Sequence, residues 1–296
     1  MTQAERGFLL LGCDMGQAEP PLTTAQLRNL RRRARELTAP DDGSRPLDAQ
    51  DLLALGYSRQ QAERIVRLLE RAHELDDYLA LAREREIFPL SCISPAYPAT
   101  VRQTLGDDCP AALFYCGHLA VLERRKLSLV GSRRLTPQGA EFAKRVGVLA
   151  AQEGFALVTG NAPGADQTAA RACLDAGGWV IYFPADALCA HRPEPRTLWL
   201  AADGWHLPFS AQRALSRNRL IHALGEKTFV AQCAHGIGGT WSGTEENLRR
   251  GYSPVFVHAD GSAGAQALQA LGAAPVKTEQ LVSLDRLWAA QTDFFG

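Results

Sequence analysis

Residues 127 to 166 constrain the fold of this 296-residue chain more than any other stretch. An apolar run at 127–130 ends at a glycine, and Thr136-Pro137 then supplies a helix N-cap and a proline at the first helical position. Apolar residues recur at helical spacing as far as Gly154, where a second apolar run begins. A strand, a helix and a strand joined by short turns predict a βαβ unit, which almost always crosses over right-handed into a parallel sheet.

Strand and helix patterns continue to alternate after residue 166. Apolar runs predict strands at residues 179–183, 228–231 and 254–257. Helical spacing predicts helices at residues 168–176, 213–224, 245–250 and 265–271. Four further assignments are a helix at 198–202, a short strand at 205–207, a glycine-rich loop at 235–244 and an amphipathic helix at 281–288. We therefore predict an α/β fold, an extended Rossmann-like sheet, parallel or mixed, with helices on both faces.

The chain before residue 87 has mainly helical patterns. Thr23-Thr24 caps a predicted helix, and residues 52–69 predict two helices joined at Gly56. This helix pair resembles helix-hairpin-helix modules, although packing into a core explains it equally well. The composition of residues 39–46 predicts a loop, and residues 112–117 predict a strand. We expect a helical N-terminal region at 1–86 and a Rossmann-like domain at 87–296.

Charge and cysteine content limit the classes of function. Lys+Arg and Asp+Glu both number 32, so the net charge is zero and a nucleic-acid site must be a local patch. One such patch could be the arginine run at residues 28–35, although a charge run is more often a solvated helix face. The seven cysteines are scattered without C-x-x-C spacing, which predicts reduced thiols and no zinc site. We expect a cytoplasmic protein without a membrane partner, because no apolar run approaches membrane-spanning length.

Two glycine-containing loops follow the strands of the βαβ unit. The carboxyl ends of parallel strands form the binding crevice of such sheets, and N–H groups at helix N-termini there attract anions. Arg133 and Arg134 add guanidinium groups, which bind phosphates through paired hydrogen bonds. The sequence therefore predicts a phosphate-binding crevice, whose ligand could be a polymer or a small nucleotide. Its candidate residues are Gly131, Ser132, Arg133, Arg134, Gly160, Asn161 and Gly164.

Three ordered motifs resemble those of the DNA-processing protein A (DprA, or Smf) family. They are VGSR at 130–133, TGNAPGAD at 159–166 and SRNRLI at 216–221, the last two similar to the family's S-G-x-A-x-G-I-D loop and R-N-R-I-I helix start. The segment CPAALFYCG at 109–117 is similar to the family's P-x-x-L-F-x-x-G approach to the first core strand. Three motifs in one sheet are far more specific than one glycine loop. The resemblance extends over about residues 50 to 285.

The resemblance implies a function and a set of contacts. It implies a non-enzymatic, cytoplasmic homodimer that binds single-stranded DNA without base specificity and assists a RecA-type recombinase in natural transformation or DNA recombination. It implies no catalytic residue, cofactor or metal. Arg133, Arg217 and Arg219 are then the main phosphate contacts. Further candidates beside the two glycine loops are Asn218, Gly239 and Thr240.

Some positions depart from the family's pattern, and they predict a divergent member. Pro163 stands where the family often has a cationic residue, and Glu245 stands where an apolar helix start is usual. The winged-helix domain that many members append is expected to be absent.

Other functions remain open on the sequence alone. The chain also resembles phosphoribohydrolases of the same broad fold, but Asn247 stands where their G-G-x-G-T-x-x-E loop has its glutamate; Glu245 or Glu246 could substitute. A nucleotide-sensing module is the third possibility. A nicotinamide dehydrogenase is disfavoured, since no G-x-G-x-x-G follows the first strand. Arg217 and Arg219 could instead form internal ion pairs, and Trp241 could either stack on a base or fill the core.

Overall fold

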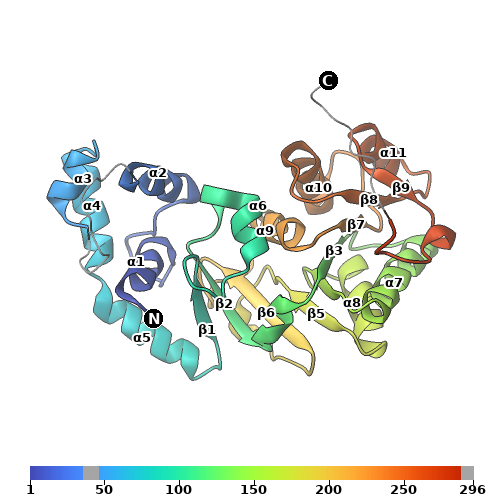
Figure 1. Ribbon diagram of the computed structural model, residues 1–296, viewed down its shortest axis with the longest axis horizontal. Helices are drawn as coiled ribbons and strands as arrows, with labels where there is room; N and C mark the ends of the chain where they lie inside the picture. Colours follow the sequence, from blue (N-terminus) through green and yellow to red (C-terminus); the bar gives the residue numbers. More distant parts are fainter. Residues whose placement is uncertain (36–46, 288–296) are drawn as a thin grey trace. The chain divides into compact units, whose positions relative to one another are not determined.

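The computed structural model describes residues 1–35 and 47–287 (Figure 1). The chain forms two compact units. Unit 1 contains residues Met1–Tyr115 and Ala201–Leu207, and unit 2 contains Cys116–Leu200 and Pro208–Gly296. The expected loop at 39–46 lies outside the described residues.

Unit 1 is mainly helical. Its helices are α1 (Gln3–Gly12), α2 (Thr24–Ala34), α3 (Ala49–Ala54), α4 (Arg59–Leu69), α5 (Ala72–Arg83) and α6 (Ala99–Leu105), with a 3-10 turn η1 at Gly106–Asp108. Strands β1 (Phe88–Ser91) and β2 (Ala112–Gly117) pair antiparallel, with Ser91 opposite Ala112. Leucines from α1, α2, α3 and α4 form a shared hydrophobic core, so the amphipathic faces of these helices are buried against one another.

Unit 2 contains a parallel sheet and five α-helices. Its strands are β3 (Lys126–Val130), β4 (Ala156–Thr159), β5 (Trp179–Tyr182), β6 (Thr197–Ala202), β7 (Thr228–Val230), β8 (Val255–His258) and β9 (Ala274–Val276). Its α-helices are α7 (Pro137–Gln152), α8 (Ala165–Asp175), α9 (Ala211–Leu224), α10 (Gly238–Arg250) and α11 (Ala263–Ala270). Three 3-10 turns are η2 (Leu119–Glu123), η3 (Leu188–Ala190) and η4 (Thr278–Gln280).

The order of the strands in unit 2 reverses direction once. It runs β6-β5-β4-β3-β7-β8-β9, and every neighbouring pair is parallel. The chain proceeds outward from β3 to β6, returns through α9 to β7, and then proceeds the other way to β9. Right-handed crossovers therefore place α7 and α8 on one face and α9, α10 and α11 on the other. The α/β fold with helices on both faces of a Rossmann-like sheet is confirmed (Figure 1).

Local signals explain the central βαβ unit. The Thr136 hydroxyl accepts a hydrogen bond from the Gly139 N–H at 3.1 Å, which caps α7 as the sequence predicts. Helices α7 and α8 pack closely at Gly147, because a Cβ atom there would collide with the backbone carbonyl of Ala169. The missing side chain thus sets the distance between the two helices.

Several predicted elements were wrong. Residues 197–202 form strand β6 beside β5, not a helix, since a short apolar run does not distinguish the two periods. Residues 205–207 form no strand, and the described residues 281–287 form no helix. Helix α10 begins at Gly238, so residues 238–244, which are seven of the ten residues of the predicted glycine-rich loop, are helical. Helices α5 and α6 and strand β1 were not assigned from the sequence.

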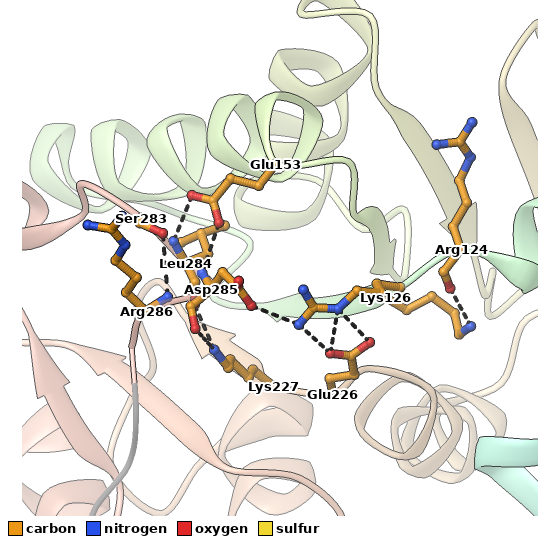
Figure 2. Close-up of polar contacts among 10 residues, drawn as sticks. Arg124, Lys126, Glu153, Glu226, Lys227, Ser283, Leu284, Asp285 and Arg286 are labelled. Carbon is orange, nitrogen blue, oxygen red and sulfur yellow. Dashed lines mark hydrogen bonds and ion pairs between the residues drawn. The ribbon is translucent and has the colours of Figure 1, made fainter.

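The segment after β9 is held by polar contacts to its backbone (Figure 2). The Glu153 carboxylate accepts hydrogen bonds from the N–H groups of Leu284 at 2.9 Å and Asp285 at 2.8 Å. Lys227 Nζ donates to the carbonyls of the same two residues, at 2.8 Å each. Leu284 is fully buried. The side chains of Glu153 and Lys227 thus satisfy the backbone N–H and C=O groups of residues 284 and 285, which a helix would otherwise pair.

Candidate functional site

A cavity of about 600 Å³ lies in unit 2 where the strand order reverses. Its lining includes Val130, the last residue of β3, and residues of the loops that follow β3, β4 and β7. Phe209, helix α9, the beginning of α10 and Asp166 in the first turn of α8 contribute the remaining lining residues. A crevice at the carboxyl ends of strands that diverge to opposite sides is where open α/β sheets bind ligands. The volume falls within the typical range of ligand sites, about 300–1,000 Å³.

Seven of the twelve predicted site residues line this cavity. They are Gly131, Ser132, Arg133, Arg217, Asn218, Gly239 and Thr240. The other five, which are not among the lining residues, are Arg134, Gly160, Asn161, Gly164 and Arg219.

Arg133 is the most available cation at the cavity. Its side chain is exposed and makes no hydrogen bond or ion pair with any described residue. Burial lowers the pKa of Arg217, and the positive charge of Arg133 lowers it further. Two guanidinium groups thus lie within electrostatic range of each other at one cavity, an arrangement that a bound anion would stabilise.

Arg217 also has partners inside the protein. Its Nη1 donates to the Phe183 carbonyl, and its guanidinium lies against Gly160, where a Cβ atom would collide with it. Burial raises the pKa of Asp166 to about 6, and the Arg217 charge opposes that rise. Arg217 therefore stabilises a buried carboxylate while it lines the cavity.

The second glycine loop is organised by Asp166. Its Oδ2 accepts hydrogen bonds from the N–H groups of Gly160 at 3.2 Å and Ala162 at 3.1 Å, so these two donors are already used. Gly164 has φ of +86°, and a side chain there would collide with the backbone of Ser132 and Arg133. Gly164 therefore makes the close approach of the two glycine loops possible.

Two polar side chains connect the walls of the cavity. The Thr240 hydroxyl donates to the Gly131 carbonyl at 2.9 Å, which joins α10 to the loop after β3. Asn218 Nδ2 donates to the Gly239 carbonyl at 2.8 Å, which joins α9 to α10. These side chains stabilise the cavity wall.

Sequence reasoning missed an apolar rim. Phe209, Leu215 and Ile237 line the cavity and are 55%, 47% and 73% exposed. Exposed apolar side chains that gather at one cavity commonly mark a binding site. A usable signal was present for two of them, because Leu215 directly precedes the SRNRLI motif and Ile237 lies in the glycine-rich stretch at residues 235–244. Trp241, by contrast, is buried outside the lining and packs edge-on against His235, so it fills the core.

The arginine run of α2 is largely paired within unit 1. Arg28 contacts Asp108 at 2.7 Å, and Arg35 and Arg32 contact Asp107 at 2.6 and 3.6 Å. These contacts neutralise much of the charge that a nucleic acid would need.

The described residues contain neither a metal-ligand cluster nor a membrane-spanning helix. None of the groups of His, Cys, Asp and Glu side chains in 1–35 and 47–287 could hold a metal ion. Within these ranges no helix has the length and apolar character that crossing a membrane requires.

The fold and the cavity define a Rossmann-like protein whose crevice at the strand-order reversal is lined by two arginines, Arg133 and Arg217. Residues 89–284 match the family model of DNA recombination-mediator protein A. The chain therefore belongs to this family, the DprA/Smf family that the sequence motifs resemble.

Relatives support this assignment. The DNA processing protein DprA of Streptococcus pneumoniae is 34% identical over 114 residues, which cover 38% of this chain and 39% of that protein. The Bacillus subtilis protein of the same name is 27% identical over 182 residues, covering 54% of this chain and 57% of that protein. The aligned segments thus span less than two thirds of either relative.

Solved structures share the fold. The structure of S. pneumoniae DprA has a TM-score of 0.72 at 23% identity and covers 95% of this chain and 96% of that one. A structure of Helicobacter pylori DNA processing protein A, described for its single-stranded DNA binding mode, has a TM-score of 0.54 at 22% identity. It covers 64% of this chain and 90% of that one.

Proposed function

We propose that this chain binds single-stranded DNA without base specificity at the cavity between β3 and β7. One observation carries the proposal: Arg133, which pairs with no residue in the described part of the chain, lies at the same crevice as exposed Phe209, Leu215 and Ile237. Single strands offer phosphates to cations and base faces to apolar side chains, and neither contact depends on base identity. The relative from H. pylori, described by its single-stranded DNA binding mode, supports the same ligand.

The proposal extends to partners and setting. A cytoplasmic homodimer that assists a RecA-type recombinase in transformation or recombination is consistent with membership of the DNA recombination-mediator protein A family. Arg133 and Arg217 are the proposed phosphate contacts within the cavity. Arg134 and Arg219, outside its lining, are proposed as contacts for the strand beyond it.

We propose binding rather than hydrolysis because no free carboxylate is among the described residues that line the cavity. Asp166 is the one carboxylate that lines the cavity among the described residues, and two backbone N–H groups already hold it. Asn247, at the position of the hydrolase glutamate, is fully buried and hydrogen-bonded to His222 and Ser253. Glu246 accepts a hydrogen bond from the Tyr252 hydroxyl at 3.0 Å and does not line the cavity.

The test is fluorescence anisotropy with a labelled oligo-dT at low and moderate salt. Arg133→Ala is expected to weaken binding about tenfold, which is about 1.4 kcal/mol, and to reduce the salt dependence. Arg171→Ala is the matched control, because Arg171 is exposed on α8 and pairs with Asp175 at 2.9 Å, outside the cavity lining. Equal losses of affinity in Arg133→Ala and Arg171→Ala would show that binding depends only on the overall charge, and the proposed site would then be wrong.

A second arm separates a strand from a small nucleotide. We expect unlabelled oligo-dT to displace the probe at concentrations at least a hundredfold below those of thymidine monophosphate. Equal competition per nucleotide would favour a nucleotide-sensing module. Release of free base from a nucleoside monophosphate would favour the hydrolase.

A further inference from the structure

Two cysteines and one arginine form a cluster in unit 1 that the proposed function does not use. Cys92 follows β1 and Cys109 precedes β2, and the antiparallel pairing brings these ends together: the Cys92 N–H donates to the Ala111 carbonyl at 2.9 Å. Arg31 Nη2 lies 3.2 Å from Cys92 Sγ, and Arg31 Nη1 lies 3.5 Å from Cys109 Sγ. Both sulfurs therefore lie against the same guanidinium group.

The Arg31 guanidinium is fixed beside the sulfurs by the backbone. Its Nη1 donates to the carbonyls of Asp107 at 2.8 Å and Cys109 at 3.1 Å. No carboxylate of the described residues forms an ion pair with it. Its charge is therefore available to a thiolate, the form of cysteine that reacts.

The pair differs from the other cysteines in its electrostatics. The neighbouring Cys92 thiol and the Arg31 charge lower the pKa of the Cys109 thiol, and the neighbouring Cys109 thiol raises the pKa of Cys92. Burial instead raises the pKa of Cys173 to about 12 and that of Cys233 to about 11. The cluster thus holds one thiol that ionises readily and one that retains its proton, both beside the Arg31 guanidinium.

We propose that Cys92 and Cys109 are a redox-active dithiol that a hydroperoxide converts to a disulfide. The Cys109 thiolate attacks the peroxide; an S–O bond forms as the O–O bond breaks, and the leaving alkoxide or hydroxide takes a proton from solvent. Cys92 sulfur then attacks the sulfenic acid of Cys109; the S–S bond forms as the S–O bond breaks. The departing hydroxide takes the Cys92 proton and leaves as water. Two electrons pass from the two sulfurs to the peroxide.

The disulfide would join the end of β1 to the approach to β2 and remove the thiolate that faces Arg31. This proposal concerns unit 1 alone and does not depend on DNA binding.

The experiment uses the full chain carrying Cys189→Ser, because Cys189 is the exposed thiol. The protein is treated with hydrogen peroxide, alkylated and digested, and the peptides are analysed by mass spectrometry. We expect a linked 92–109 pair that dithiothreitol reverses, while Cys13 and Cys173 are recovered alkylated after unfolding. Cys92→Ser is expected to leave a sulfenic acid at Cys109 that dimedone traps.

Arg31 provides the electrostatic test. Arg31→Met is expected to slow disulfide formation at least tenfold, and Arg31→Lys, which retains the charge, is expected to slow it less. The proposal fails if Cys92 and Cys109 stay reduced in the wild-type chain at peroxide exposures that oxidise Cys189. It also fails if the disulfide forms equally fast in folded Arg31→Met.

Discussion

The backbone clamp on the segment after β9 supports a quantitative prediction. Glu153 accepts hydrogen bonds from two successive N–H groups, those of Leu284 at 2.9 Å and Asp285 at 2.8 Å (Figure 2). A hydrogen bond to a charged group contributes about 1.5–3 kcal/mol, and water partly replaces bonds at a half-buried site. We therefore expect Glu153→Ala to lower the free energy of opening this segment by about 2 kcal/mol, which is about thirtyfold in the opening equilibrium.

Hydrogen exchange measured by mass spectrometry on peptides covering residues 278–287 is the direct assay. Asp285→Asn is the matched control: it removes the ion pair with Arg125 at 2.8 Å, whose side chains are 53% and 54% exposed, and keeps the Asp285 N–H. Its effect should be much smaller, since exposed ion pairs are weak. Unchanged protection in Glu153→Ala, or an equal loss in both variants, would refute the reasoning.

Three further predictions concern stability, each measured by urea unfolding. Burial lowers the pKa of His222 to about 4, so only the unfolded state gains a proton as the pH falls from about 6.5 to 4. The free energy of unfolding should therefore fall by about 3 kcal/mol over this range, and His222→Gln should remove that loss. Burial raises the pKa of Asp166 to about 6, so only the unfolded state loses a proton as the pH rises from about 4 to 6, and this lowers the free energy of unfolding. Asp166→Asn removes this loss, so the stability of the variant should rise more steeply with pH in this window than that of the wild type. An equal slope would contradict the prediction. Gly147→Ala should destabilise the protein by about 1–3 kcal/mol, because the new methyl group collides with the Ala169 carbonyl. Gly7→Ala, at a position on α1 with open space, should instead stabilise it by about 0.5–1 kcal/mol. A neutral Gly147→Ala would show that α7 and α8 can separate at no cost.

Much of the fold could be predicted because its signals are local. The N-cap at Thr136, the helical spacing after it and the apolar runs of β3 and β4 act within a few residues. The predicted helix at residues 198–202 was wrong because a run of five apolar residues is compatible with either period. Pairing with β5 decides that this run is a strand.

The loops that form the candidate site could be predicted from the sequence, but the different roles of its arginines could not. Sequence motifs identified Arg133 and Arg217 alike as phosphate contacts. The structure distinguishes them, because Arg133 is exposed and unpaired among the described residues, while Arg217 contacts the Phe183 carbonyl and stabilises Asp166. Burial and long-range partners are not visible in a motif.

The sequence by itself determined the α/β class, the two glycine loops and the family, since each depends on residue types at short spacing. Only the tertiary structure decided which loops meet at the reversal of the strand order, and that Phe209, Leu215 and Ile237 join them there. It also decided that Cys92, Cys109 and Arg31 form one cluster. These residues are far apart in the chain, and the pairing of strands and the packing of helices bring them together.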